Sequence, residues 1–248
     1  MNKIYNYKVN GWNIFIAKTL SSTMDEIKNP KYNQDINTLL LSFMQSRARG
    51  RKDNKWISQL GNLFLSINYK FDINSNIFLI NYLSGIVICD VVKSFLEDSN
   101  KVILKWPNDI LINNKKVAGI LIETESEGNK FKSIYIGAGI NLKKSPDNVI
   151  YNTTSLKEEG VKKIFKKEFI NRITSKFNYW EKYLNENNIT YILKSWMQRS
   201  YPINTEISFK NNKQEVVKGF YKGINKDGAI NIKVKGKTLS YFMIEALQ

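Results

Sequence analysis

The segment from Ile77 to Val92 is the most apolar stretch of the chain, and it limits the folds that the chain can adopt. A helix that crosses a bilayer needs about 20 apolar residues, and this run is shorter. Three polar residues, Asn81, Ser84 and Asp90, also interrupt it. We therefore expect a helix buried in the core of a folded protein, with no membrane association.

Alternating apolar residues predict strands upstream of this helix. The expected strands cover Trp12–Ile16, Thr38–Phe43 and Leu63–Tyr69, and the polar, basic stretch Gln45–Asn62 is expected to be a loop. A helix start is expected within residues 21–26. There, Ser22 with Asp25, or Thr23 with Glu26, has the spacing at which side chains satisfy the free N–H groups of a first turn.

Further strands are expected downstream, over Val102–Trp106, Ile110–Ile112, Val117–Glu123 and Phe131–Gly139. Asn113-Asn114 suits a tight hairpin turn between two of them. One face of an amphipathic helix is then indicated by apolar residues that recur at spacings of four and three: Phe165, Phe169, Ile173, Phe177, Trp180 and Leu184. A second short helix is expected over residues 191–198.

The pattern changes after Tyr201-Pro202. Short alternating runs, separated by Asn211-Asn212, Asp227-Gly228 and Gly236-Lys237, predict a small antiparallel barrel of four or five strands. We therefore expect two domains, a larger domain of strands and helices over residues 1–200 and a small all-β domain over residues 201–248.

The chain carries a net charge of +16, with its lysines spread along the whole length among many Asn and Ile residues. This distribution is typical of compositional drift, although it would also attract acidic partners and, less specifically, nucleic acid. The chain has a single cysteine, Cys89, so no internal disulfide can form. Without a secretory signal at its start, a cytoplasmic location is expected.

Three motifs carry the functional signal: Lys105–Asp109 (KWPND), Lys115–Leu121 (KKVAGIL) and Gly137–Asn141 (GAGIN). Each alone could be a turn, a buried strand or a glycine-rich bend. Chance does not readily explain all three motifs in this order and so close together in the sequence.

Together these motifs resemble the central signature of the biotin–protein ligases. The resemblance extends to Ser22-Thr23-Met24 upstream and to residues 223–229 (GINKDGA) downstream, so it covers nearly the whole chain. It implies an α+β fold in which a mixed β-sheet is flanked by helices, as in class II synthetases, with a small SH3-like β-barrel at the C-terminus.

The stretch Gln45–Asn62, here called the basic loop, matches the family pattern only in part. Gln45, Arg49, Gly50, Arg51 and Trp56 fit the family pattern. The chain departs from it at three positions, which are Ala48, Asp53 and Asn54. These departures affect how the loop would close more than what it would bind.

The resemblance implies an ATP-dependent ligase that forms biotinyl-adenylate and passes biotin to a lysine of a biotin carboxyl carrier protein or carboxylase subunit. Its substrates are biotin and ATP, with Mg²⁺. Bringing two anions together requires cations, and Arg and Lys suit phosphate and carboxylate. The chemistry needs little acid–base catalysis, which agrees with a chain that has no histidine.

By the same resemblance, catalysis is expected from Lys116, Arg49 and Arg51. Biotin contacts are expected from these three and from Ser22, Thr23, Met24, Gln45, Gly50, Gly119 and Gly137. The nucleotide would contact Arg51, Trp56, Asn108, Lys116 and Asn141, and Asp109 would assist Mg²⁺.

Structural roles are the alternative for several of these residues. Ser22 and Thr23 could only cap a helix, and Trp56 could only fill a hydrophobic gap. Asp109 could be a salt-bridge partner, and Lys116 a solvated lysine at a strand end. Cys89 lies among apolar residues and is expected to be a buried small hydrophobe rather than a nucleophile.

Three other functions compete with this one. Lipoate–protein ligases share the fold and the chemistry but rely on a His-Asp pair, which this chain lacks. Because the first ligase-type strand begins near Trp12, we expect no N-terminal DNA-binding domain, no specific DNA binding and no repressor function. A non-enzymatic biotin binder would not need Lys116, Asn108 and Asn141. The protein is expected to be a monomer or a weak homodimer.

Overall fold

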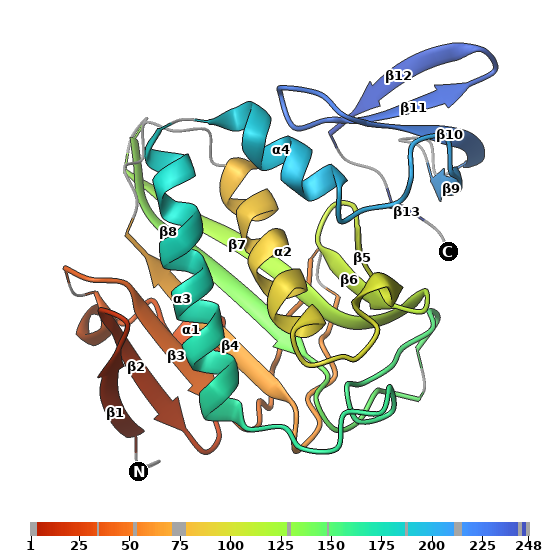
Figure 1. Ribbon diagram of the computed structural model, residues 1–248. Helices are drawn as coiled ribbons and strands as arrows, with labels where there is room; N and C mark the ends of the chain where they lie inside the picture. Colours follow the sequence, from red (N-terminus) through yellow and green to blue (C-terminus); the bar gives the residue numbers. More distant parts are fainter. Residues whose placement is uncertain are drawn as a thin grey trace.

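The protein is built on a twisted sheet with helices packed on one face, as the computed structural model in Figure 1 shows. The structure describes residues 4–33, 35–51, 54–70, 78–127, 130–147, 149–186, 188–210, 215–242 and 245–246. The helices on that face are α2 (Phe78–Lys93), α3 (Lys166–Asn185) and α4 (Ile189–Met197). This arrangement confirms the expected sheet with flanking helices.

The large sheet has the strand order β1-β2-β3-β4-β8-β7-β6-β5. Its strands are β1 (Ile4–Val9), β2 (Trp12–Ala17), β3 (Thr38–Ser42), β4 (Leu63–Tyr69), β5 (Val102–Lys105), β6 (Asp109–Ile112), β7 (Lys115–Glu127) and β8 (Lys130–Ile140). The sheet is mixed because β2 and β3 run parallel while the other pairs are antiparallel. The strands expected from alternation are confirmed, with β7 longer at both ends than predicted.

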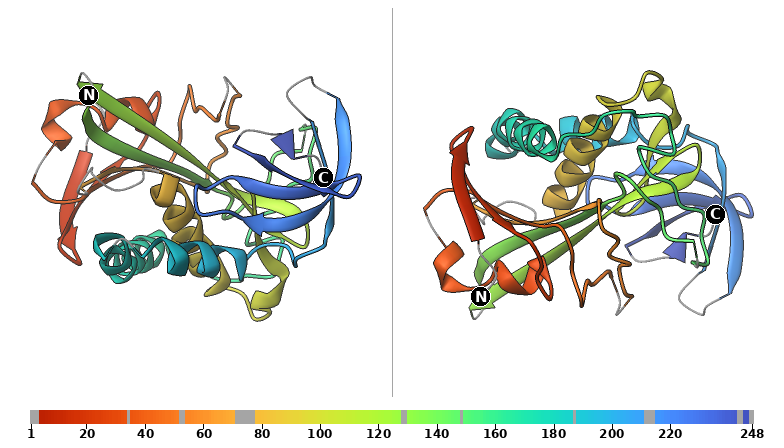
Figure 2. Two further views of the ribbon diagram at one scale, coloured as in Figure 1. Left: turned by 90° about the horizontal axis from the view of Figure 1, so that it is seen from above. Right: turned by 90° about the horizontal axis from the view of Figure 1, so that it is seen from below.

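The parallel pair needs a crossover, and the chain makes it on the face opposite α2–α4. This connection contains α1 (Thr23–Glu26) and the 3₁₀ turn η1 (Pro30–Tyr32); Figure 2 shows it across the sheet from the long helices. A small cluster that includes Met24, Ile27 and Tyr32 packs there, separate from the main core. A second 3₁₀ turn, η2 (Ser99–Lys101), precedes β5.

Helix α2 lies between the sheet and the other helices, and its apolar residues are buried all round. The predicted core helix is thus confirmed over residues 78–93, while Ile77 lies outside the described residues. Cys89 is fully buried, and burial raises the pKa of its thiol to about 12, as expected for a small hydrophobe. No helix in the described ranges is long and apolar enough to cross a membrane.

The amphipathic pattern of α3 is confirmed with one exception. Phe165 is 62% exposed, whereas Phe169, Ile173 and Phe177 are buried. The helix begins one residue later, and the extended backbone of Phe165 at the N-cap removes its side chain from the apolar face. Strand β1 was not predicted, because its mixed polar and apolar residues form a partly exposed edge.

The C-terminal residues form a second, antiparallel sheet with the order β12-β11-β10-β9-β13. Its strands are β9 (Glu206–Lys210), β10 (Val216–Ile224), β11 (Ile230–Val234), β12 (Lys237–Tyr241) and β13 (Glu245–Ala246). The predicted small β-sheet unit is confirmed, and its antiparallel sheet is consistent with an SH3-like domain.

Most of the predicted turns lie where they were expected. Asn113 and Asn114 both have positive φ, as does Gly228. The turn before β12 lies at Lys235-Gly236, one residue earlier than predicted, because these two residues take the left-handed backbone and Lys237 already pairs in the sheet. The Asn211-Asn212 turn lies outside the described residues.

Several contacts join the two sheets across the boundary expected at residue 200. The Tyr82 hydroxyl donates to the Gly228 carbonyl at 2.6 Å, and the Trp106 indole donates to Tyr82 at 3.0 Å. The Ile224 backbone N–H also donates to Met197 Sδ at 3.3 Å. The division into domains 1–200 and 201–248 therefore stays a prediction, with a polar contact chain across it.

Candidate active site

A cavity of about 650 Å³, here called the central cavity, opens on the face of the sheet opposite the long helices. It is lined by α1, the loop after β3, the β5–β6 turn, β7, β8 and residues 149–151. All the predicted site residues line it except Asn141: Ser22, Thr23, Met24, Gln45, Arg49, Gly50, Arg51, Trp56, Asn108, Asp109, Lys116, Gly119 and Gly137.

Three glycines form the floor of the central cavity. Gly119 on β7 pairs with Gly139 on β8, and Gly137 follows two residues away on the same face of β8. A Cβ atom at Gly137 would lie 2.8 Å from Met24 Sδ, and one at Gly139 only 2.4 Å from Trp56 Cε2. The absence of side chains lets Met24 and Trp56 lie directly on the backbone.

Trp56 lies across Gly119 and Gly139 with its indole N–H buried and without a partner in the described part of the chain. The ring fills the floor of the cavity, so the hydrophobic role considered for it is present in this structure. A buried indole N–H without an acceptor lowers the stability of the fold. A ligand with a hydrogen-bond acceptor at this position would remove that cost.

We expect Gly139→Ala to destabilise the protein by about 1–3 kcal/mol, because the new methyl group overlaps the Trp56 ring. Denaturant unfolding measures the loss. The control is the same substitution in a Trp56→Ala background, where the overlap is gone and the cost should largely disappear. An equal cost in both backgrounds would contradict the assigned contact.

A β-bulge places Lys116 over this floor. Strict alternation along β7 would turn Lys116 to the same side as Ala118 and Ile120, whose side chains are buried. The pairing of β6 with β7 shifts between Ile110 and Leu111, so that β7 has one extra residue at this point. Bulges redirect side chains in this way. As a result, Lys116 Nζ would lie 3.3 Å from a Cβ atom at Gly119.

The Lys116 ammonium is held by one carboxylate and two rings. Its Nζ lies 2.7 Å from Asp109 Oδ1, 5.4 Å from the centre of the Trp56 ring and 5.1 Å from that of Tyr151. Lys116 is thus not a solvated strand-end lysine, and the salt-bridge role considered for Asp109 is present. Cation–π contacts at partly desolvated sites contribute on the order of 1 kcal/mol.

Tyr151 was not singled out in the sequence, because no local pattern marks it. The segment that carries it runs beside the start of β7, where Lys116 N donates to the Asn152 carbonyl at 2.8 Å and Thr154 N donates to the Lys116 carbonyl at 3.0 Å. This backbone pairing brings the Tyr151 ring to the rim of the cavity.

Arg51 and Asn108 meet on the other side of the cavity. Arg51 Nη1 donates to Asn108 Oδ1 at 3.2 Å, and Asn108 Nδ2 donates to the Ile120 carbonyl at 2.5 Å. Asn108 follows a cis Trp106-Pro107 bond in the β5–β6 turn. Burial lowers the pKa of the Arg51 guanidinium, and the nearby Asp109 carboxylate opposes this change. The pair connects the basic loop to the KWPND turn.

Backbone hydrogen bonds join the described residues on the two sides of the basic loop. Gly50 N donates to the Asn54 carbonyl at 2.6 Å, Asn54 N donates to the Arg51 carbonyl at 3.1 Å, and Trp56 N donates to the Ala48 carbonyl at 3.1 Å. Two of the departures from the family pattern, Ala48 and Asn54, therefore take part through their backbones. Asp53 and its neighbour Lys52 lie outside the described residues.

Arg49 points to the rim, where two carboxylates hold it. Its guanidinium lies 2.5 Å from Asp25 and 2.6 Å from Glu123, and Lys28 also pairs with Glu123 at 3.0 Å. These hydrogen bonds raise the pKa of Arg49 against the opposing effect of its partial burial. To contact a ligand, Arg49 would have to exchange one or both carboxylates for it.

The α1 side of the cavity is polar and closely hydrogen bonded. Gln45 Oε1 accepts from the Thr23 backbone N–H at 2.6 Å and from the Thr23 hydroxyl at 3.0 Å, and Ser66 donates to that hydroxyl at 2.8 Å. Ser22 caps α1 by accepting from Asp25 N at 3.3 Å. The capping role of Ser22 is confirmed, while its side chain also borders the cavity.

Asn141 is not among the residues that line the central cavity, and its nucleotide contact stays a prediction. It is buried, with Nδ2 donating to the Thr154 carbonyl at 3.1 Å and Oδ1 accepting from Asn62 at 3.3 Å. Asn62, which the sequence did not reveal, is the centre of this network: its Oδ1 accepts from the backbone N–H groups of residues 142, 143 and 144. The GAGIN motif thus ends in a structural asparagine network.

The lining of the central cavity is strongly cationic. Its described residues include Arg49, Arg51, Lys55, Lys105 and Lys116, and Asp109 is the one carboxylate among them. Its apolar end is formed by Met24, Leu65, Leu121 and Gly137. In the described ranges, no group of three or more His, Cys, Asp or Glu side chains could hold a metal ion. The geometry suits a ligand with an apolar body and an anionic end beside a second anion.

Comparison with known proteins agrees with this geometry. Residues 16–141 match the model of the biotin/lipoate A/B protein ligase family. A biotin–[acetyl-CoA-carboxylase] ligase of Paracoccus denitrificans is 24% identical over 200 residues, 78% of this chain and 83% of that protein. The bifunctional ligase/repressor BirA of Escherichia coli is 28% identical over 200 residues. These residues are 77% of this chain and 60% of BirA.

The fold has close counterparts among solved structures. The biotin protein ligase of Aquifex aeolicus, solved with biotin and ATP, superimposes with a TM-score of 0.81 at 22% identity, over 97% of this chain and 98% of that one. The family match covers half of the chain and contains the loop, Lys116 and the glycine floor. The chain therefore belongs to the biotin/lipoate A/B protein ligase family.

Proposed function

We propose that this protein is a biotin–protein ligase, which activates biotin with ATP and transfers it to a lysine of a biotin carboxyl carrier protein or carboxylase subunit. The names of its relatives support biotin as the acid. The observation that carries the proposal is the position of Lys116, which a β-bulge turns into a cationic cavity above a floor of glycines.

The first reaction joins two anions. A carboxylate oxygen of biotin attacks the α-phosphorus of ATP, the bond between that phosphorus and the bridging oxygen breaks, and pyrophosphate leaves with the electron pair. In the cavity, Lys116 and Arg51 lie where they can offset charge at the carboxylate and the phosphate. The rate would come from positioning and electrostatics rather than from acid–base catalysis.

The apolar end of the cavity suits the ring system of biotin. Met24 on Gly137 and the side chains of Leu65 and Leu121 form that end, and Ser22, Thr23 and Gln45 provide polar groups beside it. Trp56 and Asn108 also line the cavity and would contact the nucleotide. Arg49 would reach biotin or the adenylate only after leaving Asp25 and Glu123.

Mg²⁺ fits this site as an ion that ATP brings with it. Mg²⁺ commonly binds through one or two carboxylates together with substrate phosphates. Asp109 is the carboxylate among the described lining residues, and it is already paired with Lys116. We therefore propose that Asp109 contributes at most one ligand, and that the metal supplies further charge neutralisation at the phosphates.

In the second reaction, the amine of the acceptor lysine attacks the carbonyl carbon of biotinyl-adenylate. The new C–N bond replaces the C–O bond to AMP, AMP leaves, and the amine loses a proton. Until then the mixed anhydride must be kept from water, and the loop that carries Arg51 and Trp56 is placed to cover it.

The direct test of the first reaction is pyrophosphate release from ATP and Mg²⁺. We expect release that depends on biotin and stays at background with lipoate in its place. Lipoate-dependent release without biotin-dependent release would contradict the proposal and identify the other activity of the family.

Arg51→Gly should loosen the hold on the adenylate. The substitution removes the Arg51–Asn108 hydrogen bond and an anion-binding group while the loop gains freedom. We expect adenylate synthesis to continue while free biotinyl-adenylate and biotin on bystander proteins increase severalfold. Bystander labelling is compared with wild type at matched rates of pyrophosphate release. Equal labelling would mean that Arg51 does not retain the intermediate.

We expect the protein to bind double-stranded DNA only without sequence preference. Its charge of +16 should give weak association that falls steeply with salt, because each phosphate contact releases counterions. Titrations of two unrelated duplexes between about 50 and 200 mM salt measure this. A sequence-selective footprint at physiological salt would contradict the expectation and favour a repressor role.

A further inference from the structure

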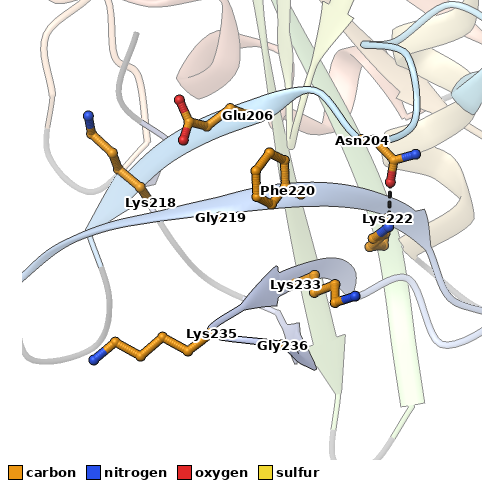
Figure 3. Close-up of a pocket in the computed structure, with 9 residues that line it drawn as sticks. All are labelled: Asn204, Glu206, Lys218, Gly219, Phe220, Lys222, Lys233, Lys235 and Gly236. Carbon is orange, nitrogen blue, oxygen red and sulfur yellow. Dashed lines mark hydrogen bonds between the residues drawn. The ribbon is translucent and has the colours of Figure 1, made fainter.

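A second hollow, of about 440 Å³, lies on the C-terminal sheet and shares no lining residue with the central cavity. Figure 3 shows the side chains around it. They come from β9, β10, β11 and the turn before β12. We call Lys218, Phe220, Lys222, Lys233 and Lys235 the lysine–phenylalanine face.

Phe220 lies at the centre of this face. Residues two apart on a strand share a side, so Lys218 and Lys222 flank Phe220 along β10. Across the sheet, Phe220 pairs with Lys233 on β11 and with Glu206 on β9. Directly paired residues have Cβ atoms about 5 Å apart. The ring is thus bordered by three lysines and one carboxylate.

The face is exposed and carries a net positive charge. Phe220 is 47% exposed, although most large apolar side chains are buried. Lys222 donates to Asn204, but Lys218, Lys233 and Lys235 form no ion pair with any described residue. Lys218 and Lys222 lie diagonally across the strand pair from Lys233, and a bound anion would reduce the repulsion among these charges.

An acidic protein segment fits this face better than nucleic acid does. Single-stranded nucleic acid typically binds to several aromatic rings that stack successive bases along a basic groove. Here Phe220 is the one aromatic residue among the described lining residues, and the carboxylate of Glu206 beside it would repel a continuous phosphate chain. A peptide with carboxylates around one apolar side chain would match both the lysines and Phe220.

We propose that the lysine–phenylalanine face binds an acidic segment of the protein that accepts biotin. The inference rests on the proposed ligase function, since that function supplies a protein acceptor. The face would raise the affinity for the acceptor and the rate of encounter without contacting biotin or ATP. Its loss should therefore weaken docking and leave adenylate synthesis unchanged.

The experiment compares two double variants with the same change in net charge. Lys218→Glu with Lys233→Glu reverses the face, and the control Lys162→Glu with Lys163→Glu reverses two exposed lysines between β8 and α3. Affinity for an apo biotin carboxyl carrier domain is measured by titration, and KM for the same domain by biotin transfer. Pyrophosphate release with hydroxylamine as acceptor reports adenylate synthesis alone.

We expect the face variant to raise both Kd and KM for the carrier domain on the order of tenfold, with the effect shrinking at high salt. The control variant should change them by less than about twofold. Phe220→Ser should also weaken docking, without the salt dependence. Thermal unfolding confirms that each variant is folded.

Unchanged carrier affinity in the face variant would overturn the proposal. It would also be overturned if the face variant lost binding of a single-stranded oligonucleotide while carrier affinity stayed the same. Failure of the ligase function would show differently, as absence of biotin-dependent pyrophosphate release in wild type. The titration still decides whether the face binds the carrier in that case.

Discussion

Lys116→Met should lower the rate of biotin-dependent pyrophosphate release roughly 10²–10³-fold, equivalent to about 3–4 kcal/mol, if the lysine acts like a charge-stabilising donor. Methionine keeps most of the bulk of the side chain and removes the ammonium group, which lies over the Trp56 and Tyr151 rings. Biotin binding should weaken much less than the chemical step. Rapid-quench or coupled assays of pyrophosphate release, with a biotin titration, separate the two effects.

Lys115→Met is the matched control for this substitution. Lys115 is the adjacent lysine at the start of β7, it is exposed, and it does not line the central cavity. Its loss should leave the rate within about twofold of wild type. The Lys116 variant should remain folded, because a partly exposed ion pair such as that with Asp109 contributes on the order of 1 kcal/mol or less. Unchanged pyrophosphate release would remove Lys116 from its assigned role.

The largest effect on stability is expected at Asn62. Asn62→Ala removes the shared acceptor of three backbone N–H groups and the donor to the Lys144 carbonyl, in a residue with no exposed surface. A buried polar group without a partner costs roughly 1–3 kcal/mol. Because some of these groups can regain water, we expect a total loss of about 3 kcal/mol in the free energy of unfolding.

Asn68→Ala provides the comparison. Asn68 is also buried, on β4, but neither its oxygen nor its nitrogen has a hydrogen-bond partner in the described structure. Removing an unsatisfied amide offsets the small cavity that the substitution leaves, so the change should be about 1 kcal/mol or less. Urea unfolding measures both variants. Equal losses would show that the Asn62 network does not stabilise the segment after β8.

Much of the fold could be predicted because local patterns and tertiary structure agree. The alternation in Leu63–Tyr69 and the period of α3 were sufficient to place these elements. The predictions were less accurate where the pattern of apolar residues does not follow the observed backbone conformation. Phe165 continues the apolar period but precedes the helix, and β1 is an edge strand without a clean alternation.

The site was predictable to the extent that motifs specify residue types. The motifs led to the lysine, the glycines and the arginines, and the structure brings these to one cavity. They could not reveal the bulge that turns Lys116 into it, because a bulge is a property of the pairing between two strands. Nor could they separate Asn108, which borders the cavity, from Asn141, whose amide is used in the network with Asn62.

Tyr151 shows a second limit of the sequence. It lies 35 positions after Lys116 in the chain. Its ring reaches the Lys116 ammonium because its segment pairs with the start of β7 through backbone hydrogen bonds. Long-range pairing of this kind has no local signal. The same holds for the lysine–phenylalanine face, where adjacent lysines belong to different strands.

The central claim is that the protein attaches biotin to a carrier lysine at the expense of ATP. The most direct measurement incubates the protein with ATP, Mg²⁺, biotin and an apo biotin carboxyl carrier domain, and determines the mass of the carrier. We predict one added biotinyl group on the carrier lysine, absent without ATP and strongly reduced with Lys116→Met. An unmodified carrier under conditions in which an authentic biotin ligase modifies it fully would contradict the claim.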